Sequence, residues 1–208
     1  MYAAVQMLVE ARWSRRTEVL MAKARTPRRA WIDQGLLALA AGGPAAVRIE
    51  TLAQELGVTK GGFYGYFADR QALLEEMLDT WEREVTESVI DRVETLAGNQ
   101  DARNKLRRLF AIVAVVDEQP TTGVAVELAI RDWARRAPDV AQRLRRVDHR
   151  HMAYLRSLFG EFCASEVEVE ARCLITMSIR LGDHLVPVDH ANRSRAEVLA
   201  RVLRQQLA

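Results

Sequence analysis

The feature that most constrains how this chain can fold is the segment at residues 47–67, which reads VRIETLAQELGVTKGGFYGYF. In its first part the apolar residues recur at helical spacing, which predicts a short helix with one buried face. These residues are Ile49, Leu52, Ala53 and Leu56. Gly57 follows, and glycine readily adopts the left-handed conformation that ends a helix. Thr59 stands where its hydroxyl can accept an amide hydrogen bond at the start of a second helix, predicted over about residues 60–66.

Two short helices joined by a glycine-containing turn are typical of a helix-turn-helix, whose second helix enters the major groove of DNA. The predicted second helix carries a cation at Lys60 and phenols at Tyr64 and Tyr66. Cations and hydroxyls of this kind contact DNA phosphates and base edges. The segment therefore predicts double-stranded DNA as a partner.

The same residues resemble the DNA-binding domain of the tetracycline-repressor (TetR) family of bacterial transcription regulators. The usual family pattern is Gly-Val-Ser/Thr-Lys-Gly-x-Phe/Leu-Tyr-x-His/Tyr-Phe, followed by Lys or Arg and an apolar pair. This chain matches the pattern at Gly57, Val58, Thr59, Lys60, Gly61, Phe63, Tyr64, Tyr66, Phe67, Arg70, Leu73 and Leu74. The resemblance covers about residues 28–80. It implies a homodimer that binds a palindromic operator and releases it when a small-molecule effector binds the C-terminal part, and it implies that the last two helices, at roughly residues 165–206, pair with those of a second subunit.

The chain departs from the family pattern at three positions. Arg48 stands where the family commonly has a Ser or Thr that caps the first of the two helices, and an arginine reaches a phosphate but does not cap. Gly62 and Gly65 lie inside the second helix, where each costs about 1 kcal/mol relative to alanine. This helix should therefore depend on the packing of Phe63 and Phe67, while the glycines let the backbone approach DNA. The expected DNA-contacting residues are Arg48, Thr51, Thr59, Lys60, Gly61, Gly62, Tyr64, Tyr66 and Arg70, the last on a phosphate.

The rest of the sequence predicts helices and no sheet, because apolar residues recur at helical spacing and no window alternates with a period of two. Helices are expected at about 28–41, 70–96, 101–117, 121–136, 138–159, 165–185 and 194–206. The fold class is all-α, with a basic extension at 1–27, a helix-turn-helix domain at 28–70 and a helical-bundle regulatory and dimerisation domain at 71–208. The single helix at 70–96 would be about 40 Å long and would link the two domains. Burial inside one subunit is the alternative to dimer contacts for the last two helices.

Charge is uneven along the chain, which agrees with nucleic-acid binding by one end. Residues 1–70 hold ten Lys or Arg against six Asp or Glu, whereas the whole chain has a net charge of only +2. The extension at 1–27 contributes to this asymmetry. The extension is interpreted as a mobile tail or as the product of a gene start placed too early, and an arm that contacts DNA is the alternative. The sequence leaves open whether residues 1–20 exist in the native protein.

Catalytic and metal-binding patterns are missing from the sequence, so no catalytic residue, metal ligand or cofactor is expected. The pairs Asp183-His184 and Asp189-His190 are better interpreted as a solvated loop than as a metal site. Cys163 and Cys173 are expected to be core residues, with oxidation sensing as the alternative. No stretch is apolar enough to span a membrane and no signal peptide is evident, so a cytoplasmic protein is expected.

A ligand pocket between helices could be lined by large apolar residues, although the sequence favours ordinary core packing for each of them individually. The candidates are Trp81, Phe110, Trp133, Met152, Tyr154 and Met177. The charged run at residues 131–151 is interpreted as a solvated helix face, with Arg131, Asp132, Arg135 and Asp139 paired locally, or else as a contact with a ligand or with the other domain.

The leading hypothesis is a sequence-specific transcription regulator, a repressor relieved by a small molecule. The alternative is a helical ligand-binding or interaction protein with a vestigial helix-turn-helix, and the glycines of the second helix are its best support. An enzyme on a helical scaffold has no residue constellation in its favour. The effector, the operator and the sign of regulation are beyond the sequence.

Overall fold

The computed structural model describes residues 26–186 and 190–208, and this part of the chain contains helices, turns and loops but no strand. The predicted all-α class is therefore confirmed for the described residues. Nearly all of the predicted extension at 1–27 lies outside them. No described helix is both long enough and apolar enough to cross a membrane.

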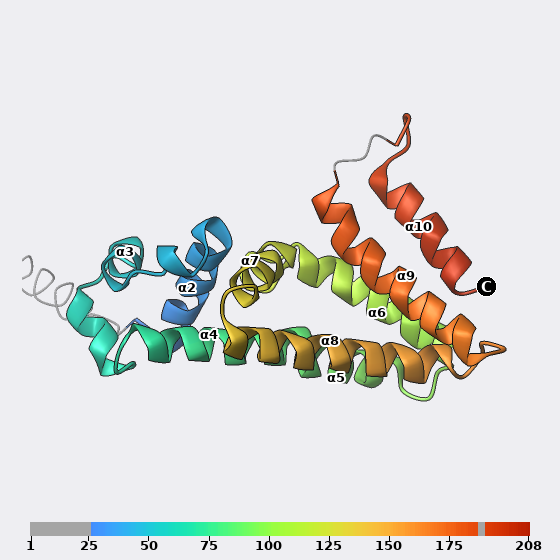
Figure 1. Cartoon of the computed structure of the whole chain (residues 1–208), viewed down its shortest axis with the longest axis horizontal. Coiled ribbons are helices and arrows are strands. Elements are labelled where there is room, and N and C mark those ends of the chain that lie inside the picture. The colour runs from blue at the N-terminus through green and yellow to red at the C-terminus, as the bar shows by residue number, and fades with distance from the viewer. Residues whose placement is uncertain (1–25, 187–189) are drawn as a thin grey trace, which may run out of the picture.

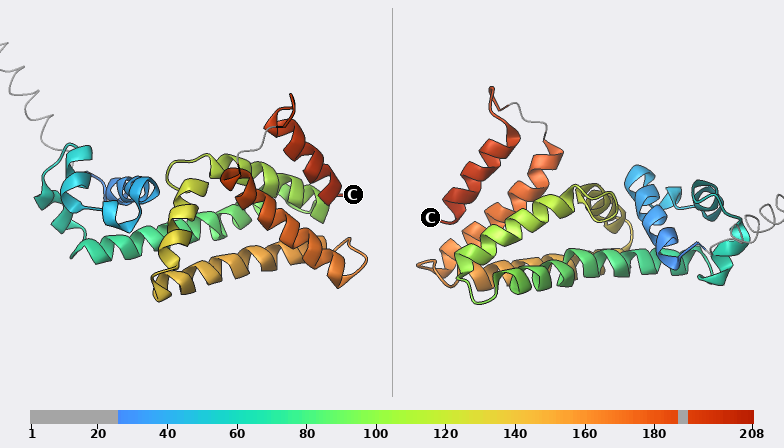
Figure 2. Two further views of the ribbon diagram at one scale, coloured as in Figure 1. Left: turned by 45° about the horizontal axis from the view of Figure 1, so that its top comes forward. Right: turned by 180° about the vertical axis from the view of Figure 1, so that it is seen from behind.

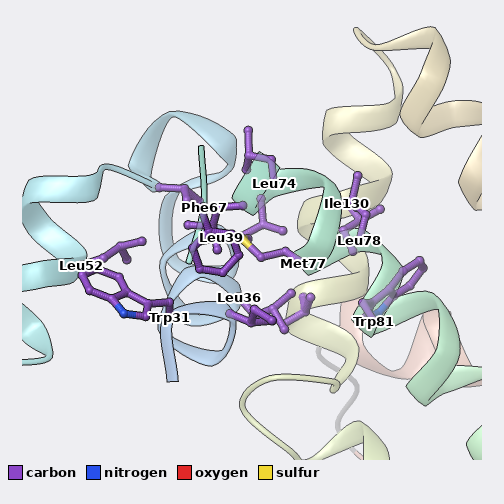
Figure 3. Close-up of a cluster of buried hydrophobic side chains, with 14 of the residues drawn as sticks. Trp31, Leu36, Leu39, Leu52, Phe67, Leu74, Met77, Leu78, Trp81 and Ile130 are labelled. Carbon is purple, nitrogen blue, oxygen red and sulfur yellow. The ribbon is translucent and has the colours of Figure 1, made fainter. Parts of the chain in front are cut away.

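The N-terminal unit consists of two α-helices and two 3₁₀ turns. These are α2 (Arg28–Gly42), η1 (Pro44–Ala46), α3 (Ile49–Glu55) and η2 (Lys60–Gly65). Trp31, Leu36 and Leu39 form the inward stripe of α2, and all three side chains are fully buried. Trp31 meets Phe63 of η2 edge to face, with ring centroids 5.4 Å apart. Figure 3 shows this cluster of side chains filling the space between α2, α3 and the next helix.

The predicted long helix at 70–96 is two helices, which corrects the expectation of a single rod. α4 (Arg70–Val85) and α5 (Glu87–Ala97) meet at Thr86, whose φ of −112° and ψ of −87° depart from helical values. The buried Thr86 hydroxyl donates to the Glu82 carbonyl at 2.5 Å, and such side-chain bonds compete with the regular helical pattern. The two helices still run nearly in line along the base of the molecule (Figure 1). The start of α4 agrees with the sequence, since the Asp69 carboxylate accepts from the Ala72 amide at 2.8 Å.

The remaining five helices follow the predicted windows closely. They are α6 (Ala102–Asp117), α7 (Val124–Ala134), α8 (Pro138–Phe159), α9 (Glu166–Leu185) and α10 (Arg195–Gln206). Local capping explains several of their starts: the Asp101 side chain accepts from the Asn104 amide, and Ser194 forms a capping box with Glu197. In Figure 1, α8 lies alongside α4 and α5, α7 packs against both α2 and α8, and α10 lies at the far end from α3.

Two hydrophobic clusters hold these elements together, and the first crosses the predicted domain boundary at residue 70. It joins α2, α3 and η2 to α4, and continues to Val126 and Ile130 of α7 and to Val140 and Val147 of α8. Ile130 lies beside Leu78 in Figure 3. Gly35 permits the close approach of α2 to α4, because a Cβ atom there would lie 2.5 Å from the Met77 sulfur. The N-terminal unit is therefore packed directly against the body as well as joined to it through α4.

The second cluster lies farther along the molecule and joins α5, α6, α8 and α9. It includes Val93, Leu106 and Phe159, all of which are fully buried. Beyond it, α9 leaves large apolar side chains exposed: Val167, Leu174, Ile175 and Leu185. Both views in Figure 2 show α10 at the end of the body farther from α2 and α3.

Candidate nucleic-acid interface and effector cavity

The turn between α3 and η2 forms as the sequence predicts. Gly57 has a φ of +65°, and the Val58 amide donates to the Ala53 carbonyl at 2.9 Å. The element that follows is a 3₁₀ helix rather than an α-helix. Phe63 fixes it to the core, stacking on Phe67 with ring centroids 5.2 Å apart. The expectation that Phe63 and Phe67 hold this helix in place is thus confirmed.

One side of η2 is buried and the other faces solvent. Phe63 is fully buried, whereas the neighbouring Tyr64 side chain is 53% exposed. Lys60, Gly61 and Gly62 are also exposed, as is Thr51 on α3. Tyr66 is half-buried at the end of the turn. The segment therefore presents a cation, a phenol and bare backbone on one surface.

Two capping expectations are decided by the structure. Thr59 stands at the N-terminal boundary of η2, but its hydroxyl makes no capping hydrogen bond, so the predicted cap is wrong. In the tighter 3₁₀ turn the Thr59 backbone carbonyl accepts from the Gly62 amide at 2.9 Å instead. Arg48, as expected, does not cap α3, and its exposed side chain donates to the Ala45 carbonyl at 3.3 Å.

Lys60 is engaged within the helix-turn-helix in the free protein. Its ammonium group forms an ion pair with the Glu50 carboxylate of α3, and both side chains are largely exposed, at 48% and 67%. The hydrogen bond between them lowers the pKa of Glu50 and raises the pKa of Lys60. A phosphate that binds Lys60 must therefore compete with Glu50.

Arg70 has a structural partner that the sequence did not indicate. Its half-buried guanidinium donates to the Val47 carbonyl at 2.6 Å and also to the Pro44 carbonyl. These bonds tie the start of α4 to the segment just before α3. Only the guanidinium N–H groups of Arg70 that do not bond to these carbonyls remain available for the expected phosphate contact.

The glycines of η2 are not required by the backbone or by packing. Gly61 and Gly62 both lack a positive φ. A Cβ atom at these positions would meet its nearest neighbour at 3.8 Å and 3.9 Å, which is ordinary van der Waals contact. The fold alone therefore gives no reason for glycine at either position.

A cavity of about 220 Å³ lies in the body, among α5, α6, α8, α9 and α10. Phe110, Tyr154 and Met177 line it, as expected from the sequence. The other three candidates do not line it: Trp81 and Trp133 pack in the first cluster, and Met152 packs against the second. The positions of these three residues agree with ordinary core packing, which the sequence favoured for each of them individually.

A buried ion cluster stands at one end of the cavity and joins four helices. The Arg180 guanidinium of α9 lies 2.7 Å from Asp117 of α6 and 2.7 Å from Glu127 of α7. Arg131 of α7 bridges Glu127 and Asp148 of α8 at 2.8 and 2.6 Å. Burial would raise the pKa of Glu127, but the charges of Arg180 and Arg131 outweigh it and hold that pKa below its ordinary value.

This cluster corrects the prediction of a solvated helix face at Arg131, whereas Asp132, Arg135 and Asp139 are exposed as expected. Arg131 pairs inward with Glu127 and Asp148, and Asp132 pairs with Arg136. The sequence analysis also missed Glu127, which is only 1% exposed, and Arg180. The sequence did contain a signal for both residues. Glu127 is the one acidic residue in the apolar run VAVELAI, and Arg180 lies in the last turns of the apolar window at 165–185.

His151 contacts the break between α4 and α5 and lines the cavity as well. Its Nε2 donates to the Val85 carbonyl at 2.9 Å, at the point where the helical pattern is interrupted. Burial lowers the pKa of His151, which favours the neutral ring. The break, the histidine and the cavity therefore share one location.

The described residues hold no group of His, Cys, Asp and Glu arranged to bind a metal ion. His184 is exposed on α9, whereas Asp189 lies outside the described part. Cys173 is buried, and burial raises the pKa of its thiol to about 11; Cys163 is half-buried. The buried position of Cys173 agrees with a core residue, because a thiol with a raised pKa is a poor nucleophile near neutral pH.

Comparison with known proteins agrees with this geometry. Residues 32–77 match the family model described as bacterial regulatory proteins, tetR family. No curated protein sequence matches the chain. Among solved structures, a transcriptional regulator from Rhodococcus sp. Rha1 superposes with a TM-score of 0.64 at 18% identity, covering 88% of this chain and 94% of that one.

Two further solved structures share the fold. A TetR-family regulator from Mesorhizobium loti superposes with a TM-score of 0.61 at 18% identity, covering 86% of this chain and 92% of that chain. The regulator FadR from Bacillus subtilis, in complex with stearoyl-CoA, gives a TM-score of 0.63 at 14% identity, with coverages of 87% and 97%. The similarity extends over both the helix-turn-helix unit and the helical body.

Proposed function

We propose that this chain, which belongs through residues 32–77 to the bacterial regulatory proteins of the tetR family, is a repressor that a small molecule releases from its operator. In this proposal residues 28–70 bind DNA, and residues 71–208 bind the ligand and form a homodimer. The observation that carries it is η2, which the buried Phe63 anchors and which presents Lys60 and Tyr64 to solvent.

The DNA contacts proposed here combine charge with close approach of the backbone. Lys60 and Arg48 are exposed cations, and Thr51 and Tyr64 are exposed hydroxyls on the same unit. Gly61 and Gly62 leave the backbone bare where the fold does not require it, which favours a near approach of η2 to the groove. Base contacts are few in this set, so we expect DNA shape to contribute much of the specificity.

The proposed dimer is formed through α9 and α10. The exposed apolar side chains of α9 support it, with Leu174 64% exposed. In a two-fold dimer, two η2 elements would read half-sites about 34 Å apart or a multiple of that distance, so the operator would be palindromic.

The proposed release mechanism is a shift between two arrangements of the body. Val85, Thr86 and Val89 line the cavity at the α4–α5 break, and α4 leads directly into the DNA-binding unit. Arg180 lines the same cavity and pairs with Glu127 of α7, which packs against α2 through Ile130. In this mechanism the ligand binds more tightly to the arrangement that does not fit the operator. The operator affinity then falls by the ratio of the ligand's affinities for the two arrangements.

Selection of the purified protein against random duplex DNA tests this function, with the mass in solution recorded alongside. We expect a dimer that enriches a palindromic site. Lys60→Ala should weaken binding to that site and reduce its salt dependence, whereas Lys105→Ala, on α6 in the body, should do neither. A folded protein that enriches no site at low salt would favour the alternative, a ligand-binding protein with a vestigial helix-turn-helix.

A further inference from the structure

The size and the walls of the cavity restrict what it can hold. Its volume of about 220 Å³ exceeds the roughly 150 Å³ that accommodates benzene, and falls short of the usual range of about 300–1,000 Å³ for drug-sized ligands. Most of the wall is aliphatic or aromatic, with Val89, Leu109, Phe110, Val113 and Leu199 among the lining residues. The interior therefore suits a compact, mainly apolar molecule.

The charges around the cavity oppose an anionic ligand. The ion cluster at its end contains three carboxylates, on Asp117, Glu127 and Asp148, against the guanidinium groups of Arg131 and Arg180. Both guanidinium groups are thus already paired, and the cluster carries one excess negative charge. A carboxylate placed beside them would be desolvated without gaining a cation of its own.

The other titratable groups that line the cavity do not reverse this balance. The pKa of His151 is lowered by burial, so the ring is neutral near pH 7. The Tyr154 hydroxyl donates to Glu94 at 2.7 Å. At the rim stand Glu118, His184 and Arg195, all exposed, with Arg195 3.4 Å from the His184 ring. Exposed charges at the rim are screened by solvent.

Three residues that line the cavity have a buried side-chain nitrogen or oxygen atom that makes no hydrogen bond with the other described residues. One is Arg180, whose Nη1 is nonetheless ion-paired with Glu127 at 2.7 Å, so two uncharged atoms are left without a polar partner. They are the Thr176 hydroxyl of α9 and the side-chain oxygen of Gln206 at the end of α10. A buried polar group without a partner is costly, and a bound molecule that supplies the missing bond removes that cost. Thr176 and Gln206 belong to α9 and α10, two of the helices that line the cavity.

We propose that the cavity binds a compact, mainly apolar, uncharged molecule that carries a hydroxyl group, which pairs with Thr176 and Gln206. This inference rests on the proposed function, since it names the class of effector for the same site. The ligand proposed here differs from the stearoyl-CoA in the Bacillus subtilis structure, because both guanidinium groups of the cluster are already paired and the cavity volume of about 220 Å³ favours a smaller molecule.

Three molecules with one ring system test the proposal: naphthalene, 2-naphthol and 2-naphthoate, titrated calorimetrically into the full chain without DNA. We expect 2-naphthol to bind about two- to tenfold more tightly than naphthalene, as one net hydrogen bond allows. The carboxylate should bind more weakly than either. Thr176→Val, which keeps the shape of the side chain, should remove the advantage of 2-naphthol and leave naphthalene binding unchanged.

Controls separate a local loss of a hydrogen bond from a change in folding. Ser178→Ala, elsewhere on α9 and outside the cavity lining, should retain the full preference for 2-naphthol, and each variant is checked by thermal unfolding. Gln206→Leu should also reduce the preference. Tightest binding by 2-naphthoate, an unchanged preference in Thr176→Val, or no binding by either naphthalene or 2-naphthol would overturn the proposal.

Operator binding is measured separately on the site selected from random DNA. Ligand binding with the expected order in a protein that binds no DNA would support the ligand class while the repressor function fails. Operator binding with the carboxylate as the preferred ligand would refute the ligand class and leave the repressor function standing.

Discussion

Replacing Glu50 by glutamine tests whether the helix-turn-helix restrains Lys60, the cation that we propose binds DNA. Glu50 lies in the first turn of α3 and pairs with Lys60 at the start of η2, and both side chains are exposed. In the Glu50→Gln variant Lys60 loses its carboxylate partner and a negative charge leaves the DNA-facing surface. We expect the variant to bind the operator more tightly than the wild type and with a steeper salt dependence.

The size of the effect follows from counterion release. Each phosphate that a protein cation neutralises on duplex DNA changes the slope of log K against log salt concentration by about 0.9. In the proposed complex, Lys60 of the wild type is shared between Glu50 and a phosphate, so its full release in the variant adds at most one neutralised phosphate. Raising the salt from about 50 to about 200 mM should then weaken operator binding by the variant up to about 3.5-fold more than binding by the wild type. Folding stability should hardly change, because the pair is exposed and such pairs contribute little.

Fluorescence anisotropy with the selected operator, repeated across this salt range, measures the slope directly. Glu55→Gln is the matched control, because Glu55 is exposed on the same helix and forms no ion pair with another described residue. Both substitutions remove one negative charge, but only Glu50→Gln releases Lys60. Equal slopes for the two variants would refute the reasoning, as would an increased slope that persists when Glu50→Gln is combined with Lys60→Ala.

Three further changes test other parts of the molecule. Gly62→Ala should retain the fold, stabilise it by up to about 1 kcal/mol and weaken operator binding, as compared by thermal unfolding and anisotropy; unchanged affinity would show that backbone approach is unimportant there. Glu127→Gln should cost about 3–5 kcal/mol in chemical denaturation near neutral pH. The pKa of Glu127 is lowered in the fold, so its carboxylate stabilises the folded protein fully at pH values above the ordinary carboxyl pKa. This stabilisation, and with it the cost of the substitution, should decrease as the pH falls through the lowered pKa. A cost that does not depend on pH would contradict the ion cluster. Leu174→Glu should produce monomers in sedimentation and weaken operator binding, whereas a stable dimer would place the interface elsewhere.

Much of the fold follows from local information. The spacing of apolar residues determined which windows are helical, because each helix must bury a continuous face. Gly57 ended α3 through its left-handed backbone, and Asp69 and Ser194 started α4 and α10 by accepting amide hydrogen bonds. The motif around Lys60 and Tyr64 also indicated the DNA-binding unit, since its residue types and spacing were specific.

The features of the fold and of the cavity that the sequence did not predict depend on contacts between distant segments. The break at Thr86 was not predicted, because the apolar stripe continues through it and the stabilising His151 lies on another helix. Arg70 is held by carbonyls of the segment before α3, and Trp81 and Trp133 pack in the first cluster rather than line the cavity. Only the tertiary structure brought together Asp117, Glu127 and Arg180 from three helices. Periodicity shows which side of a helix is buried, whereas the partner of each buried charge depends on how the helices pack.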